Sequence, residues 1–477
     1  MATHTVLVAQ SGSGKSALLG RIVEELLIQT HARCLILDPN SDFRRVHELK
    51  PARLWDRASY DPVARRGLLP HEATQEEFRQ QWARVPVRVW GGDGFGEEDA
   101  TARRVRLWWP ALAVDFLAED LDPVERSELY HCHAFLRAIA DLARFQEKGE
   151  GENFSALETA ETLYLEAAAA SSSPRAAQQR LEVGLRKAFP LDELTEEAVG
   201  RLYKGLRDAL PIPWLLRPLP RAPEKVQEAV VRSRIRARFE RAMTALNYVS
   251  PEIIRFYFGK AREYQAAGIL ASEPPEESAS RARLEVIDLA SLAARDTRLL
   301  VLNATLSTVW DRARSEWALA LQGDAEEDSR VPTFIILEEA HNLVPAEPRS
   351  KPEAALREQF RQIVAEGRKY GLFLILVSQR PDKLDPLVLS ECENKAVMRL
   401  DSWAVRDLAV EALGLQSVPE DLLARTVEFG IGRALLAGRW VRDKPRVLYA
   451  AARRTIEGGR SLRAKHWAGS SASGAKG

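Results

Sequence analysis

Short apolar runs alternate with amphipathic segments near both ends of this chain, whereas its middle carries only helix-like spacing. Residues 6–9 and 34–38 form apolar runs that predict two buried, parallel strands, and residues 15–30 between them predict the crossover helix. A shorter strand is expected at 85–90. Strand-like patterns return towards the C-terminus, at 284–289, 299–303, 334–337, 372–377, 396–400, 433–436 and 446–449.

The middle of the chain predicts a separate helical part. From about residue 100 to 270, apolar side chains recur at helical spacing and strand-like alternation disappears. We therefore expect an α/β fold with a mostly parallel sheet flanked by helices and a large α-helical insertion. The expected divisions are a core made of residues 1–99 and 281–452, an insertion of residues 100–270, and a basic, disordered tail of residues 453–477.

The amino-acid composition limits the partners and the cellular compartment that we expect for the protein. Lysine plus arginine and aspartate plus glutamate both number 68, so contact with nucleic acid must come from local basic surfaces. The three cysteines are far apart in the sequence and suit a reducing cytosol. No apolar run approaches the roughly 18 residues of a membrane span, and the N-terminus leads directly into the first expected strand without a signal peptide. We therefore expect a cytoplasmic protein without a membrane partner.

A glycine- and serine-rich loop connects the first expected strand to the first expected helix and ends in Gly-Lys-Ser. Gly12 and Gly14 let the backbone point its N–H groups at phosphate oxygens, at the positive end of the helix dipole. Lys15 would neutralise the terminal phosphates, and the Ser16 hydroxyl would bind Mg²⁺. The strict pattern has glycine where Ala9 stands, and one methyl group fits there if the backbone φ is ordinary. The predicted cofactors are ATP and Mg²⁺, bound by Gly12, Ser13, Gly14, Lys15, Ser16 and Ala17.

Two further strand ends carry polar residues that suit phosphate chemistry. The apolar run 334–337 is followed by Glu338, which we assign to the metal, and Glu339, which we assign to polarising the attacking water. The apolar run 372–377 is followed by Ser378 and Gln379. The Gln379 amide would orient water or report loss of the γ-phosphate, although a lone amide at a strand end more often serves a loop hydrogen bond.

From Glu338 onward, the chain resembles the HerA/FtsK class of hexameric DNA-pumping ATPases, and HerA in particular. The matching motifs, in the family's order, are LEEAHN at 337–342, EGRKYGL at 366–372, VSQRP at 377–381, LVLSECEN at 387–394 and MRL at 398–400. GSGKS at 12–16 and LILDPN at 35–40 fit as well. The resemblance covers roughly residues 1–45 and 330–440. It implies a RecA-like (ASCE) P-loop NTPase fold in which Gln379 faces the γ-phosphate.

The resemblance also implies a ring whose sites are completed by an arginine from the next subunit. Arg361 and Arg368 lie seven residues apart on one expected helix, so they share a face. We favour Arg368 because it belongs to the GRKYG motif and rank Arg361 second, while a solvated helix face explains either residue equally well. Members of the family usually carry a small β-barrel before the P-loop, and we expect this chain to lack it because its P-loop begins near residue 9.

Together these features predict a cytoplasmic, Mg²⁺-dependent ATPase that forms a homo-hexamer and translocates double-stranded DNA with a nuclease or defence-effector partner. The alternative is an ATP-dependent switch or scaffold that gates an effector in a defence complex without processive translocation. A small-molecule kinase is disfavoured, because the glutamate pair and the Ser-Gln strand end suit activation of water.

Overall fold

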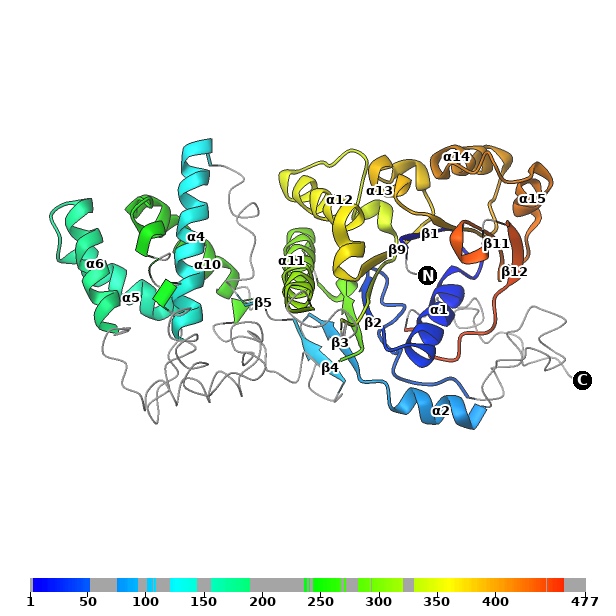
Figure 1. The fold of residues 1–477 in the computed structure, drawn as a ribbon, viewed down its shortest axis with the longest axis horizontal. Helices are drawn as coiled ribbons and strands as arrows, with labels where there is room; N and C mark the ends of the chain where they lie inside the picture. The colour runs from blue at the N-terminus through cyan, green and yellow to red at the C-terminus, as the bar shows by residue number, and fades with distance from the viewer. Residues whose placement is uncertain are drawn as a thin grey trace, which may run out of the picture.

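The computed structural model describes residues 3–51, 75–92, 101–105, 107–108, 121–143, 156–188, 236–237, 240, 243–266, 270–271, 282–292, 294–320, 330–442 and 444–458. Its strands are β1 (Thr5–Val8), β2 (Arg33–Asp38), β3 (Val87–Gly91), β4 (Ala102–Arg104), β5 (Leu107–Trp108), β6 (Leu270–Ala271), β7 (Leu284–Asp288), β8 (Thr333–Leu337), β9 (Leu372–Ser378), β10 (Asn394–Val397), β11 (Arg433–Ala437) and β12 (Arg446–Tyr449). A ten-stranded sheet has the order β12-β11-β10-β1-β9-β8-β2-β7-β3-β4, and β5 pairs with β6 separately (Figure 1).

The sheet is mostly parallel, as the sequence predicts. The strand β1 pairs in parallel with β9 and β10, and the parallel arrangement continues from β9 as far as β4. The exception is β11, which is antiparallel to both β10 and β12. The strand β9 lies between β1 and β8. Because β1, β9 and β8 are neighbours and parallel, their carboxyl ends lie at the same edge of the sheet.

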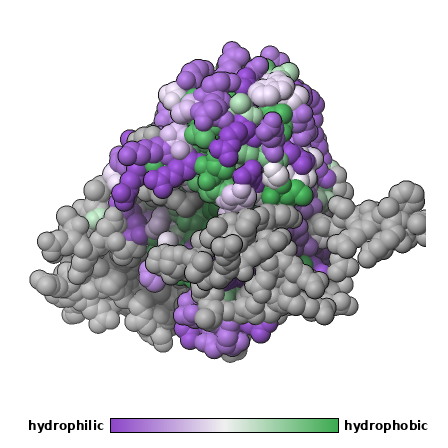
Figure 2. All heavy atoms as spheres, turned by 90° about the vertical axis from the view of Figure 1, so that its right-hand side faces the viewer, coloured by the Kyte–Doolittle hydropathy of each residue, from purple (hydrophilic) through white to green (hydrophobic). Residues whose placement is uncertain are grey.

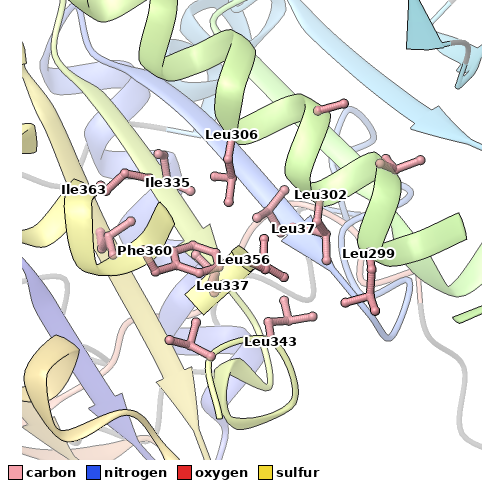
Figure 3. Packing of buried hydrophobic residues seen from close by; sticks show 14 of the residues in the cluster. Leu37, Leu299, Leu302, Leu306, Ile335, Leu337, Leu343, Leu356, Phe360 and Ile363 are labelled. Carbon is pink, nitrogen blue, oxygen red and sulfur yellow. The ribbon is translucent and has the colours of Figure 1, made fainter. Parts of the chain in front are cut away.

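Helices cover both faces of this sheet. They are α1 (Lys15–Gln29), α2 (Gln75–Ala83), α11 (Arg295–Ala320), α12 (Lys351–Tyr370), α13 (Pro386–Ser390), α14 (Trp403–Leu413) and α15 (Glu420–Ala424). Side chains on successive strand residues point to opposite faces. Phe334 and Ile336 of β8 therefore pack with residues of α1 and α2, whereas Ile335 and Leu337 pack with α11 and α12 (Figure 3).

One expected strand is wrong. Residues 299–303 lie inside helix α11, where Leu299, Leu302 and Leu306 point from the helix towards the sheet (Figure 3). Their separations of three and four residues are helical, but the neighbouring Leu300 and Val301 are buried too. The sequence of a helix that is covered on several sides contains one continuous apolar run. Periodicity cannot distinguish such a run from a buried strand.

The middle of the chain is mainly helical, with short strands that the sequence did not predict. Helices α4 (Pro123–Ala143), α5 (Ala156–Ala169), α6 (Pro174–Ala188) and α10 (Pro251–Ala266) lie together on one side of the sheet (Figure 1). The expectation that strands are absent between residues 100 and 270 is wrong for β4, which extends the main sheet, and for the β5–β6 pair. Strands of two or three residues are too short to show alternation. Among the described residues, no helix combines the length and the apolar character that crossing a membrane requires.

The beginning of the expected C-terminal tail is part of the core. Arg453 and Arg454 are 1% and 4% exposed, so they neither extend into solvent nor lie free for phosphate contacts. Residues 451–458, the C-terminal strap, run beside α1 and the loop after β2, where Thr455 bridges to Leu49. The sequence did not predict this burial, because arginine is usually exposed. An arginine side chain can nevertheless be buried when its N–H groups donate to acceptors. The rest of the expected tail, residues 459–477, lies outside the described residues.

Candidate functional site

The loop between β1 and α1 has the backbone that a phosphate cradle needs. Gly12 and Gly14 have φ angles of +73° and +93°, a region that side chains disfavour. Gly14 is also closely packed, since a Cβ atom there would lie 3.1 Å from Ile431 Cγ2 and 3.2 Å from the Gly432 nitrogen. Substitution of Gly14 would therefore strain the loop and push it away from the segment before β11.

Ala9 is accommodated without strain. Among the described residues, the non-glycine residues with positive φ are Ser41, Glu339 and Arg442, so Ala9 keeps an ordinary backbone. Its side chain is buried in the core on the α1 side, and its N–H donates to the Ser378 carbonyl across 3.1 Å. The departure from glycine therefore leaves the loop attached to β9.

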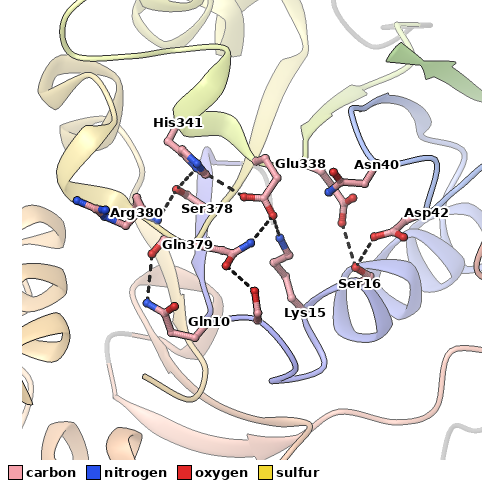
Figure 4. A network of polar contacts seen from close by, with 12 residues as sticks. Gln10, Lys15, Ser16, Asn40, Asp42, Glu338, His341, Ser378, Gln379 and Arg380 are labelled. Atoms are coloured by element: carbon pink, nitrogen blue, oxygen red, sulfur yellow. Dashed lines mark hydrogen bonds and ion pairs between the residues drawn. The ribbon is translucent and has the colours of Figure 1, made fainter. Parts of the chain in front are cut away.

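Lys15, His341 and Gln379 all contact the Glu339 carboxylate, in a polar network that joins three elements (Figure 4). Its Oε1 atom forms an ion pair with Lys15 Nζ from the start of α1. Gln379 follows β9 directly, and its Nε2 donates to the same oxygen across 2.7 Å. Ser11 of the loop donates to Gln379 Oε1 across 2.8 Å. The structure thus brings Lys15 together with Glu339 and Gln379, which lie more than three hundred residues later in the sequence.

The position of the Glu339 carboxylate depends on an unusual backbone. Glu339 has φ 48° and ψ 45°, and it begins a 3₁₀ turn over Ala340–Asn342. His341 in that turn has Nδ1 at 3.6 Å from Glu339 Oε2 and at 3.1 Å from Ser378 Oγ. Burial lowers the pKa of His341, so its ring is neutral at neutral pH. Strained backbones of this kind are concentrated at functional sites.

Oxygen atoms of the kind that bind a divalent cation meet beside Lys15, between the first turn of α1 and the loop after β2. Ser16 Oγ donates to Asp42 Oδ2 across 2.9 Å and lies 3.4 Å from Glu338 Oε1. Glu338 is fully buried, and its Oε2 has no hydrogen-bond partner among the residues that the structure describes. Burial, together with the nearby Asp38 and Asp42 carboxylates, raises the pKa of Glu338 to about 8. The Ser16 hydroxyl thus lies beside the Asp42 and Glu338 carboxylates, and the Glu338 carboxylate has an oxygen to spare for a ligand role. This set of oxygens fits Mg²⁺, which prefers oxygen ligands.

The two arginines considered for contact with a neighbouring subunit project from α12 and bind acids within their own chain. Arg368 Nη1 donates to Glu393 across 2.6 Å and is about half exposed. Arg361 donates to both oxygens of the buried Asp385, across 3.2 Å and 2.7 Å. Asp385 and Glu393 flank α13 in the sequence, so both arginines of α12 bind acids next to that helix.

Sequence reasoning assigned no role to two residues that the structure places at this loop. Asp42 stands in the polar turn after β2, and that turn was the available signal. Arg399 belongs to the MRL motif, and its Nη2 donates to the Ser11 carbonyl across 3.2 Å. The N–H of Gln10 donates in turn to the Arg399 carbonyl across 3.2 Å, which attaches the loop to the segment after β10.

A strand, a glycine loop and a helix, with an acid pair and an amide at neighbouring strand ends, define a P-loop nucleotide-binding core. Residues 1–78 match the family described as helicase HerA, central domain. This family is the one that the sequence motifs of the chain resemble, and several similar proteins are named HerA helicases.

Several known proteins share part of this sequence. Over 110 residues, 22% of this chain and 20% of the relative, it is 36% identical to a probable DNA double-strand break repair helicase HerA of Methanocaldococcus jannaschii. Over 174 residues it is 26% identical to the DNA double-strand break repair helicase HerA of Saccharolobus solfataricus, covering 36% of this chain and 32% of that one. The chain spans about a fifth to a third of the length of these curated relatives. Among solved structures, VirB4 of Thermoanaerobacter pseudethanolicus is 14% identical with a TM-score of 0.38, covering 97% of this chain and 90% of that one.

Proposed function

We propose that this chain is a cytoplasmic, Mg²⁺-dependent ATPase whose subunits form a ring, a hexamer, that translocates double-stranded DNA. The observation that carries the proposal is the contact of one Glu339 oxygen with both Lys15 and Gln379. In a P-loop site, these three groups are the cation that holds the terminal phosphates, the base for the attacking water and the amide that orients that water. Their convergence supports hydrolysis over transfer of phosphate to a metabolite.

Each predicted site residue has a place in this proposal. The phosphates would be bound by Gly12, Ser13, Gly14, Lys15, Ser16 and Ala17, and Mg²⁺ by Ser16 and Glu338, with Asp42 beside them. Bound Mg²⁺ neutralises phosphate charge during transfer. Glu339 polarises the water, and Gln379 keeps the carboxylate and the water aligned.

Substitution of each glutamate separates the two carboxylate roles. Glu339→Gln is expected to keep ATP bound and unhydrolysed, because the amide preserves the shape and removes the charge that polarises water. Glu338→Gln is expected to raise the Mg²⁺ concentration needed for half-maximal turnover. The measurements are phosphate release and retention of labelled nucleotide. If Glu338→Gln trapped ATP and Glu339→Gln only changed the Mg²⁺ requirement, the two roles would be reversed.

The proposed ring is supported by exposed apolar side chains in the C-terminal part of the core. Large apolar side chains lie exposed on α13, α14 and the segment before β11, namely Leu387, Trp403, Leu408 and Ile431. Figure 2 shows hydrophobic residues among hydrophilic ones on the side of the molecule that carries α14, α15, β11 and β12. A neighbouring subunit on this side would cover these residues, and Arg368, or Arg361 in second place, is proposed to reach a neighbour's site. The helicase names of the HerA relatives support DNA as the substrate.

The second candidate is an ATP-dependent switch or scaffold that gates an effector. The observation that favours it is the large apolar side chains exposed in the helical part, Val124, Leu165, Val183 and Tyr248. We propose that these side chains contact a nuclease or another effector docked on the proposed insertion, residues 100–270. Stimulation of ATP turnover by double-stranded DNA separates the motor from the switch.

A further inference from the structure

A buried arginine from the far end of the chain reaches the back of the nucleotide site. Arg453 lies in the C-terminal strap and is 1% exposed. Its Nη1 donates to the Ser16 carbonyl across 3.4 Å, and its Nη2 donates to the Asp42 carbonyl across 3.2 Å. These two residues carry the hydroxyl and the carboxylate that meet on the other side at 2.9 Å. The guanidinium therefore links the two backbones whose side chains form the candidate metal site.

The surroundings of Arg453 are shaped to this side chain. Gly20 of α1 leaves the space, since a Cβ atom there would collide with the Arg453 side chain. The guanidinium lies 4.3 Å from the centre of the Phe43 ring, in the loop after β2. Two further N–H groups donate to Thr455 Oγ1 across 2.9 Å and to the Ile456 carbonyl across 3.1 Å. The side chain is thus held from the strap, from α1 and from the loop.

The strap is held independently of this guanidinium. Glu24 of α1 is fully buried, and its Oε1 accepts the N–H groups of Arg454 and Thr455 across 2.9 Å and 2.8 Å. The Lys50 N–H donates to the Arg454 carbonyl across 2.8 Å, and the Ile456 N–H donates to the Glu48 carbonyl across 2.9 Å. Loss of the Arg453 guanidinium therefore leaves these strap contacts in place.

We propose that Arg453 is a positioning residue for the metal end of the nucleotide site. Ser16 belongs to α1 and Asp42 to the loop after β2, and the Arg453 fork donates to both carbonyls at once. The distance between the Ser16 hydroxyl and the Asp42 carboxylate therefore depends on the Arg453 guanidinium. That distance sets the geometry of the proposed Mg²⁺ ligands. Lysine cannot replace it, because an ammonium group lacks the planar, multidentate geometry of guanidinium. This inference rests on the proposed role of Ser16 as a Mg²⁺ ligand.

The test compares the same substitution at two adjacent buried arginines. Arg453→Lys changes the residue that contacts Ser16 and Asp42, whereas Arg454→Lys changes a residue whose guanidinium lies over the Phe78 ring. The affinity of a fluorescent, non-hydrolysable ATP analogue is measured with Mg²⁺ and with EDTA, alongside thermal unfolding. For Arg453→Lys we expect the Mg²⁺-dependent gain in affinity to fall about 10-fold or more, the range for residues that orient metal ligands. The affinity in EDTA should stay unchanged, and Arg454→Lys should retain the full gain.

Other results would overturn the inference. A parallel loss of affinity with Mg²⁺ and with EDTA, or the same loss in Arg454→Lys, would make Arg453 a general support of the fold. If Ser16→Ala lowers the Mg²⁺-dependent gain and Arg453→Lys does not, the positioning role alone is wrong. If Ser16→Ala leaves the gain intact, the proposed metal site is wrong as well.

A second variant keeps the test available if Arg453→Lys does not fold. Gly20→Ala displaces the Arg453 side chain from α1, because the added methyl group occupies its space. Gly259→Ala in α10 is its matched control, since a Cβ atom there meets nothing within 4 Å. Gly20→Ala should lose the Mg²⁺-dependent gain and Gly259→Ala should not. Equal behaviour of the two variants would contradict the inference.

Discussion

At the residue scale, the left-handed backbone conformation of Glu339 lowers the stability of the fold, and it places the Glu339 carboxylate in the site. The left-handed region disfavours a residue with a Cβ by about 1–2 kcal/mol relative to glycine. Glu339→Gly and Glu339→Ala both remove the carboxylate, but only alanine keeps the Cβ. We expect the glycine variant to have the higher free energy of unfolding by about 1 kcal/mol, measured by urea denaturation. A more stable alanine variant would show that φ 48° is not retained in solution.

Residues at strand ends were predictable, whereas contacts from distant segments were not. Glu338, Glu339 and Gln379 follow apolar runs, and the carboxyl ends of parallel strands meet at one sheet edge, so their convergence follows from the pattern. Arg453 gives no such signal. Its two acceptors at the nucleotide site, the Ser16 and Asp42 carbonyls, lie more than four hundred residues earlier in the chain, and nothing in the sequence pairs a late arginine with them.

At the element scale, the two arginines of α12 differ in what they contribute to stability. Arg361 donates two hydrogen bonds to a buried carboxylate, and removing one partner of a charged hydrogen bond costs about 2 kcal/mol. Arg368 forms an exposed pair with Glu393, and such pairs contribute about 0–1 kcal/mol. We expect Arg361→Ala to lower the free energy of unfolding by more than Arg368→Ala. Equal losses in urea denaturation would contradict this assignment.

The contribution of Arg361 should also depend on pH. Burial opposes ionisation of Asp385, yet hydrogen bonds from Arg361 hold the pKa of that carboxyl below its usual value. A lowered pKa gives stability that is present above the unfolded value, about 3.9, and that is lost as pH falls through the folded value. The stability difference between wild type and Arg361→Ala should therefore be constant near neutral pH and shrink below about pH 4. A difference that persists under acid conditions would argue against the ion pair.

Helices and strands could be predicted from the sequence where their apolar runs have a clear length or a clear polar face. The strands β8 and β9 are bounded apolar runs of strand length, and both lie within a residue or two of their expected positions. Helix α11 was mistaken for a strand because its residues 299–304 are all buried, so no polar face reveals the helical period there. For such a segment, length is a better guide than periodicity.

At the scale of the whole molecule, mixing two inactive variants tests the proposed ring. If Arg368 acts on a neighbouring site, Arg368→Ala should bind ATP but not hydrolyse it. Mixed with Lys15→Ala, it should regain some turnover, because mixed rings place an intact P-loop beside an intact arginine. Removing such an arginine costs about 10³-fold or more in hydrolysis, so partial recovery is measurable.

The control for this mixture is co-assembly of the two variants, shown by affinity-tag exchange. With co-assembly established and no recovery, Arg368 would act within its own subunit or serve structure alone. Recovery with Arg361→Ala in place of Arg368→Ala would move the role two helical turns earlier and leave the ring intact.

The most direct test of the central claim is the rate of phosphate release from Mg²⁺·ATP by the full chain, with and without linear double-stranded DNA. The account predicts turnover that requires Mg²⁺, rises when DNA is added and disappears in Lys15→Ala, while Lys187→Ala in α6 behaves as wild type without DNA. Turnover that persists in Lys15→Ala would contradict the site. Turnover that requires Lys15 but ignores DNA would contradict the motor.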